Sequence, residues 1–317
     1  MKKILPFCDN PIIKTYPYIA FYLGILEGNG IDITNLIIKE FSNVFFFRGK
    51  LDFTASGFFH KKYFHFRPNR FFIKNNIENL ICEINKERYV VVILNEKYIN
   101  TVNVDFPHDW LIYGYDNEEK VFYCAGYVES FGLRRYEAIK LSYAEIAEAL
   151  KKCPIFNGYT FTSKDTHSTW IRKTPNIQID SLYVKNILYR FLNPPIVSIY
   201  YRPIINLDIK AMKLLKVSLN KKIKNWDKLK NKTLWTQSYR ILYENIDVLN
   251  LICKNYIDNA KINEELNELS LKSYSLLLLV GKYNLNPKKV TLCEIVKYLD
   301  IIYLQEKRIV VSMIESI

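Results

Sequence analysis

The chain has 317 residues, of which 49% are hydrophobic and 24% are charged, and this composition is typical of a folded globular protein. It contains no apolar run as long as the roughly 18 residues of a membrane-spanning helix, so we expect no membrane span. The formal net charge is +13, and residues 161–317 carry almost all of it, because residues 1–160 contribute only +2. The basic second half therefore favours an acidic partner: a phosphate-bearing molecule, nucleic acid or an acidic protein.

The cysteines are scattered and include no CxxC pair, so no metal-ligand spacing is present and we expect no metal. We interpret them as thiols of a reduced, cytoplasmic protein. Residues Cys8 to Pro11 interrupt the N-terminal apolar run, so no signal peptide is expected. With only 10 glycines the chain has neither a Walker nor a dinucleotide pattern, and we expect no cofactor. The six cysteines are Cys8, Cys82, Cys124, Cys153, Cys253 and Cys293.

The first 100 residues predict three helices and two strands. Thr15 is the expected N-cap of the first helix, Pro17 fits its first turn, and Gly28 to Gly30 ends it. The second helix is expected over residues 31–47, with Val44 to Phe47 resembling a strand. Apolar residues at helical spacing predict the third helix over 75–86, and residues 89–94 are apolar enough for a buried strand.

The centre of this half is the stretch from His108 to Asp116. Leu111 to Tyr113 predicts a strand, Gly114 to Glu119 a polar turn, and Val121 to Ala125 a second strand. His108 lies at the start of the first strand, where a histidine is either a general base or an ordinary half-buried ring. A further strand is expected over 138–141. Ser142 and Glu145 then form a capping box for a helix over 143–152.

The second half is expected to be helical only. Residues 1–155 form the predicted first domain, 156–179 a linker, and 180–317 a helical domain. Apolar residues recur at a spacing of about 3.6 throughout the last segment. The expected helices cover 180–192, 206–224, 233–257, 262–283 and 291–315.

The strongest charge feature is a run of nine lysines, and it has two interpretations. It is either a solvated helix face or a surface that binds an acidic carrier protein or the phosphate of its phosphopantetheine arm. Trp226 and Trp235 lie nearby and would also allow nucleic acid, because bases stack on aromatic side chains beside cations. No nucleic-acid-binding motif is present, so this partner is less favoured. The lysines are Lys210, Lys213, Lys216, Lys221, Lys222, Lys224, Lys228, Lys230 and Lys232.

Three features resemble the butirosin biosynthesis protein H N-terminal family, whose members have a papain-like (peptidase C39-like) fold. One is Leu5-Pro6-Phe7 shortly before a helix. Another is His108 followed by Leu111 to Asp116. The last is Phe122-Tyr123 with Gly126-Tyr127, followed by Leu141-Ser142-Tyr143 opening a helix. The resemblance covers roughly residues 1–155. It implies a papain-like N-terminal domain, and with the helical second half this predicts an α+β fold with an all-helical C-terminal lobe.

The resemblance also implies an activity, because family members move an acyl group from a carrier-protein thioester to an amine in natural-product (nonribosomal peptide) assembly. A cysteine carries the acyl group, and a histidine activates its thiol. The family cysteine would lie at the helix start near Thr15 or Tyr16, where this chain has none. Cys8 is the candidate nucleophile, His108 the candidate base and Asp116 a candidate third member. The implied partners are an acidic acyl or peptidyl carrier protein and a small amine acceptor.

Two other functions stay open at this stage. The chain is alternatively a catalytically silent papain-fold relative that binds a ligand or a carrier protein, and the missing cysteine at the helix start favours this. A basic RNA- or DNA-binding protein is the third hypothesis. The sequence leaves a homodimer open.

Overall fold

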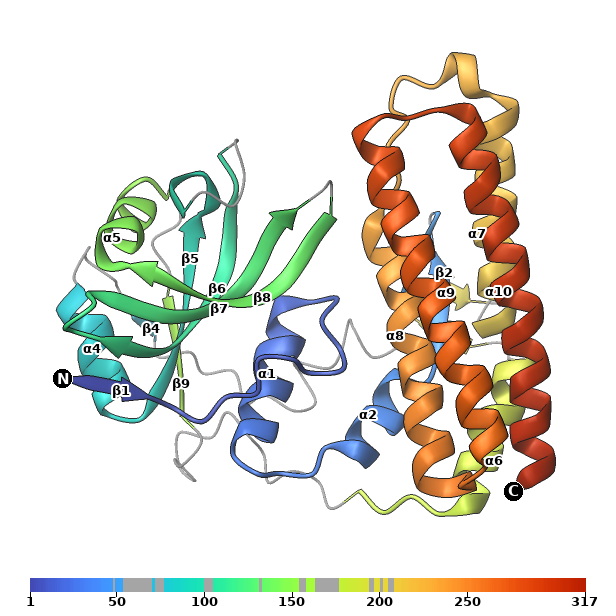
Figure 1. The fold of residues 1–317 in the computed structure, drawn as a ribbon, viewed down its shortest axis with the longest axis horizontal. Coiled ribbons are helices and arrows are strands. Elements are labelled where there is room, and N and C mark those ends of the chain that lie inside the picture. Colours follow the sequence, from blue (N-terminus) through green and yellow to red (C-terminus); the bar gives the residue numbers. More distant parts are fainter. Residues whose placement is uncertain are drawn as a thin grey trace. The chain divides into compact units, whose positions relative to one another are not determined.

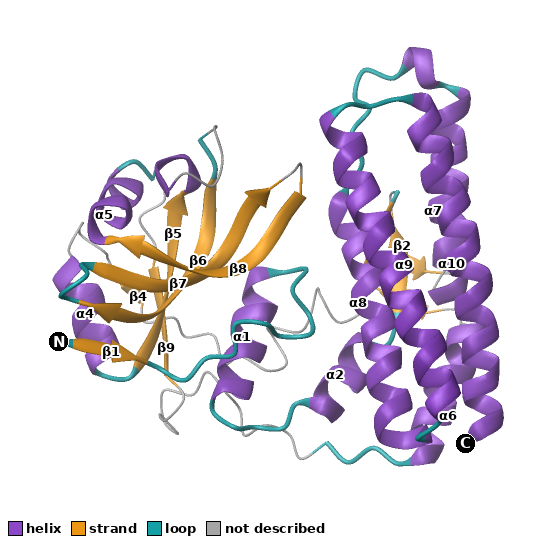
Figure 2. Cartoon of the chain, viewed as in Figure 1, coloured by secondary structure: helices purple, strands orange, loops and turns teal. Residues whose placement is uncertain are grey.

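A computed structural model describes residues 1–47, 49–53, 70–71, 77–99, 105–130, 133–153, 158–162, 177–193, 197–199, 202–204 and 208–317. The chain forms two compact units. Unit 1 comprises residues 1–33, 58–130 and 134–176, and unit 2 comprises 34–57, 131–133 and 177–317. Unit 1 carries an antiparallel sheet and unit 2 is mainly helical (Figure 2). A mixture of helices and antiparallel strands with a helical C-terminal region, as predicted, is confirmed.

Unit 1 is built on a sheet with the strand order β4-β9-β5-β6-β7-β8, in which β1 pairs with the far end of β6 (Figure 1). The helices of this part are α1 (Pro17–Gly28), α4 (Ile77–Asn85) and α5 (Tyr143–Lys151), with a short 3₁₀ turn at Glu96–Ile99. The strands are β1 (Lys2–Ile4), β4 (Arg70–Phe71), β5 (Arg88–Asn95), β6 (Pro107–Asp116), β7 (Val121–Ser130), β8 (Leu133–Ser142) and β9 (Gly158–Thr162).

The core of unit 1 lies along β5 and β6. Residues 89–92 of β5 are buried in succession, without alternation, which is the pattern of a strand covered on both faces. Ala20, Phe21 and Ile25 of α1 belong to the same core as the indole of Trp110 on β6. Burial of side chains as large as these contributes about 2 kcal/mol each and fixes the register of the central strands.

The β6–β7 hairpin is longer than predicted. Gly114 to Asp116 continue β6 instead of forming a turn, and the turn comprises residues 117–120. The reason is β1, which pairs alongside this end of β6, with Ile4 opposite Gly114. A Cβ atom at Gly114 would lie 2.8 Å from the carbonyl oxygen of Lys3, so only glycine admits the extra strand here.

Unit 2 is dominated by five helices of the described chain, which are close to those predicted. They are α6 (Ser181–Leu192), α7 (Asp208–Lys224), α8 (Thr236–Ile252), α9 (Ala260–Leu285) and α10 (Lys289–Ser316). The prediction of helices only was wrong, because β10 (Val197–Ile199) and β11 (Arg202–Ile204) form a small hairpin. Of the helices that the structure describes, none is both long and apolar enough to cross a membrane.

The unit boundary differs from the predicted domain boundary. The helix α2 (Thr34–Phe41) and the strands β2 (Val44–Phe47) and β3 (Lys50–Phe53) belong with the C-terminal helices. Backbone hydrogen bonds explain this, since the amide of Val44 donates to Asp208 and that of Leu51 to Ser238. The segment predicted as a linker contains β9, which pairs with β5; its residues 163–176 lie outside the described chain.

Candidate functional site

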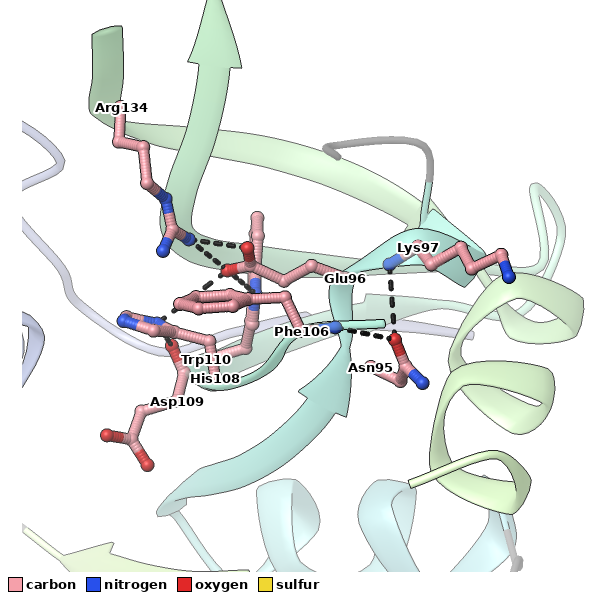
Figure 3. Close-up of polar contacts among 8 residues, drawn as sticks. All are labelled: Asn95, Glu96, Lys97, Phe106, His108, Asp109, Trp110 and Arg134. Carbon is pink, nitrogen blue, oxygen red and sulfur yellow. Dashed lines mark hydrogen bonds and ion pairs between the residues drawn. The ribbon is translucent and has the colours of Figure 1, made fainter. Parts of the chain in front are cut away.

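His108 lies at the beginning of β6 with its ring beside a buried carboxylate. Its Nδ1 atom is 3.6 Å from Oε1 of Glu96 and 3.4 Å from the carbonyl oxygen of Asp109. Glu96 opens the 3₁₀ turn directly after β5, and β5 pairs with β6, so the sheet register brings the two side chains together. Figure 3 shows the other edge of the imidazole directed away from Glu96.

Glu96 is also the partner of an arginine and of an indole. Nη2 of Arg134, on β8, lies 2.5 Å from both carboxylate oxygens of Glu96 (Figure 3). The indole Nε1 of Trp110 donates to Oε1 at 3.3 Å. The Glu96 side chain is fully buried, whereas that of Arg134 is 28% exposed. A buried carboxylate needs such donors, because an unpaired charge there would cost several kcal/mol.

Aromatic rings surround the imidazole and the guanidinium. The ring of Phe106 stacks on His108 at 5.6 Å between centroids, and the Arg134 guanidinium lies over the same ring at 4.6 Å. Tyr127 of β7 meets His108 edge-on at 5.7 Å. The Tyr127 hydroxyl donates to the backbone carbonyl of Lys14, just before α1. Tyr127 therefore links the rings around His108 to the segment that leads into α1.

The protonation states follow from burial. Burial and the nearby Arg134 guanidinium lower the pKa of His108 to about 4, so the ring is neutral near pH 7. The contact between Nδ1 of His108 and Glu96 is therefore not a charged ion pair, and Arg134 is the positively charged partner of Glu96. Burial raises the pKa of Glu96 to about 7, although Arg134 opposes this. The Glu96 carboxylate oxygen and the Asp109 carbonyl oxygen both lie near Nδ1. We therefore assign the ring proton to Nδ1, which leaves Nε2 as an acceptor.

Cys8 lies beside α1 and away from its first turn. Its backbone amide donates to the carbonyl of Gly24 at 2.8 Å. Gly24 is seven residues after Pro17, which places this contact roughly 10 Å along the helix axis from the helix start. Burial and the neighbouring Glu27 carboxylate raise the pKa of the Cys8 thiol. The thiol is thus kept protonated, and the described contacts of His108 do not include Cys8.

Asp116 lies at the opposite end of β6 from His108. Eight residues of strand separate the two, which corresponds to roughly 26 Å. Its carboxylate accepts hydrogen bonds from the amides of Glu118 and Glu119 and lies 3.6 Å from the Lys2 ammonium. Asp116 therefore shapes the hairpin turn, and the carboxylate beside His108 is that of Glu96 instead.

Glu96, Phe106 and Arg134 were not predicted as site residues from the sequence. One signal could have indicated Glu96, since an acidic residue directly after an apolar strand lies at a sheet end, where catalytic and binding groups gather. Arg134 has no such signal, because it reaches the site only through the pairing of β8 in the sheet. Among the described residues no group of histidine, cysteine or acidic side chains is suited to hold a metal ion.

The lysine run divides into two groups. Lys216 forms an ion pair with Asp300, Lys213 lies over Tyr303, Lys222 donates to the Thr233 carbonyl, and Lys232 lies over Trp226. These four contacts are internal to unit 2. The others are solvent-exposed: Lys210, Lys221, Lys224, Lys228 and Lys230.

Neither a scan of protein-family models nor a search of curated proteins finds a match to this chain.

Proposed function

We propose that unit 1 is a papain-like domain that binds an acyl thioester on a pantetheine arm without taking the acyl group onto a cysteine. The observation that carries the proposal is the position of Cys8. Its thiol interacts with Glu27 in the last turn of α1, and its pKa is raised. A cysteine nucleophile requires a thiolate beside its base, whereas the Cys8 thiol is protonated and the described contacts of His108 do not include it.

The chemistry around His108 supports this ligand class. Above a pH of about 7 the ionised Glu96 cancels the charge of Arg134, and the imidazole is neutral, so the group then carries no net charge. A neutral polar ligand is therefore favoured over a small anion. The Nε2 atom of His108 and the partly exposed guanidinium can hydrogen-bond to amide or acyl groups. The exposed ring of Phe106 offers an apolar contact to the thioester.

Isothermal titration calorimetry with octanoyl-pantetheine tests the proposal. We expect saturable binding by the wild type and by Cys8→Ala, because the thiol takes no part. His108→Ala should weaken binding by about tenfold, which corresponds to about 1.4 kcal/mol for a lost hydrogen bond. Asp116→Asn is the matched control and should bind like the wild type. Equal affinities of the His108→Ala variant and the wild type would exclude this site.

The second candidate is the amide-forming acyl transfer that the family resemblance implies, with Cys8 as the acyl carrier. The placement of Glu96 beside Nδ1 favours it, because a carboxylate there orients an imidazole to act as a base through Nε2. The segment from Asp9 to Lys14 would have to move for Cys8 to reach the ring. Amide formation from a thioester and an amine that disappears in Cys8→Ala would establish this function in place of silent binding.

A further inference from the structure

The excess positive charge of the chain is concentrated at one end of unit 2. This end consists of the connection from α7 to α8 and the connection from α9 to α10, which lie together in Figure 1. Hydrogen bonds join them: Leu234 and Asn284 exchange two, and the Tyr283 hydroxyl donates to the Lys232 carbonyl. Residues 221–235 and 282–289 contain nine lysines and one acidic residue, Asp227, giving a net +8 of the chain's +13.

Seven of these lysines are solvent-exposed, and in the part of the chain that the structure describes none of the seven has an ion-pair partner. We call this set the lysine end. Crowded like charges with a single acidic residue, Asp227, among them repel one another, so the arrangement costs stability unless a partner supplies the counter-charge. The lysine end comprises Lys221, Lys224, Lys228, Lys230, Lys282, Lys288 and Lys289.

The helix ends do not explain all of these lysines. Lys221 and Lys224 lie in the last turn of α7, where the helix dipole favours cations. Lys288 and Lys289 lie at the first turn of α10, where the dipole disfavours them. Neither α8 nor α10 has a side-chain cap or an acidic residue in its first turn. The positive ends of two helices thus add to the field of the lysines.

The aromatic residues at this end disfavour single-stranded nucleic acid. Trp226 is buried, packs against Tyr283 and lies under the Lys232 ammonium. Trp235 is half exposed, but the Lys50 ammonium lies 3.5 Å above its ring. Stacked bases would need free indole faces, and no arginine is present in these two connections to pair with base edges.

We propose that the lysine end is the docking surface for an acidic carrier protein. The identity of the partner rests on the proposed function, whereas the surface rests on the charges of unit 2 alone. Point charges on flexible stems suit a carboxylate-rich helical surface, since they speed and orient the encounter without demanding a fixed geometry.

The test uses the full chain and an acidic acyl carrier protein bearing octanoyl-phosphopantetheine. The fourfold variant K228E/K230E/K288E/K289E reverses the charge of four side chains of the lysine end. The variant K254E/K261E/K297E/K307E makes the same change of net charge at other exposed positions of unit 2, whose side chains have no ion-pair partner among the described residues. We expect the first variant to weaken carrier binding by at least about tenfold and the second by less than about twofold at low salt.

Binding of free octanoyl-pantetheine distinguishes a failure of the docking surface from a failure of the proposed function. It should bind both fourfold variants like the wild type, and its failure to bind the wild type would contradict the proposed function alone. Equal losses of carrier binding in the two variants, or no loss in the first, would overturn the docking surface. So would tight, lysine-end-dependent binding of a DNA duplex of about 20 base pairs without carrier binding, with affinity falling steeply as salt rises.

Discussion

The neutral state of His108 is the residue-level feature with the clearest pH signature. Its pKa of about 4 in the folded chain lies below the ordinary value of about 6.5. The folded state therefore binds fewer protons than the unfolded state between these values. The stability contributed by the neutral ring is complete above about pH 6.5 and is lost as pH falls towards 4. Because the side chain is 22% exposed, solvent weakens the effect of the pKa shift, and we expect the free energy of unfolding to fall by about 2 kcal/mol.

Proton NMR titration can measure this directly, since the chain has only four histidines. One ring resonance, which is absent from His108→Asn, should keep its neutral shift from about pH 8 down to about pH 5. A His108 resonance that titrates near 6.5 would show that the ring is solvated and ordinary.

Removal of the Glu96 carboxylate should leave a partly buried guanidinium without its main counter-charge. We expect Glu96→Gln to lower the free energy of unfolding by about 3 kcal/mol, at the lower end for a broken buried pair because Arg134 is partly exposed. Urea unfolding of unit 1 measures the change. Glu119→Gln breaks the exposed pair with Lys140 and should cost less than about 1 kcal/mol. Equal costs in the two variants would contradict the buried pairing.

At the scale of elements, the close approach of the N-terminal segment to α1 holds Cys8 in place. A Cβ atom at Gly24 would lie 2.5 Å from the carbonyl oxygen of Cys8 and 2.6 Å from the Phe7 ring. Gly24→Ala should therefore cost about 2 kcal/mol or more and displace the segment. Faster alkylation of the Cys8 thiol by iodoacetamide, compared with the wild type, would report the displacement. Unchanged stability and alkylation would contradict this packing.

Most elements could be predicted from the sequence because their signals are local. Pro17 and the glycines around residue 28 bounded α1, and the capping box at Ser142 placed the start of α5, where both bonds of the box are present. The errors came from long-range pairing. Gly114 to Asp116 continue β6 because β1 pairs beside them, and β9 pairs with β5 from a segment expected to be a linker. Glu96 and Arg134 meet for the same reason.

At the scale of whole units, a pair of buried carboxyl groups controls the pH dependence of unit 2. Glu306 of α10 is fully buried, and among the described residues neither of its carboxyl oxygens has a hydrogen-bond partner. Asp208, the first residue of α7, is also buried. Burial alone raises the pKa of Glu306 to about 8. Unit 2 therefore keeps Glu306 protonated at neutral pH.

The folded state binds one more proton than the unfolded state between about pH 4.5 and 8, so the stability of unit 2 falls as pH rises through this range. Glu306→Gln removes the ionisable group with little change of shape. It should raise the free energy of unfolding by about 2 to 3 kcal/mol near pH 7 and flatten its pH dependence. Glu294→Gln, an exposed position on the same helix, is the control. Destabilisation of unit 2 by Glu306→Gln at pH 8 would contradict a protonated Glu306.

The central claim is that unit 1 holds an acyl thioester near His108 while the Cys8 thiol stays out of reach. Intact-mass spectrometry after incubation with octanoyl-pantetheine tests it most directly. The account predicts an unchanged protein mass under conditions in which calorimetry shows saturated binding. A stoichiometric gain of one octanoyl group that is lost in Cys8→Ala would contradict it.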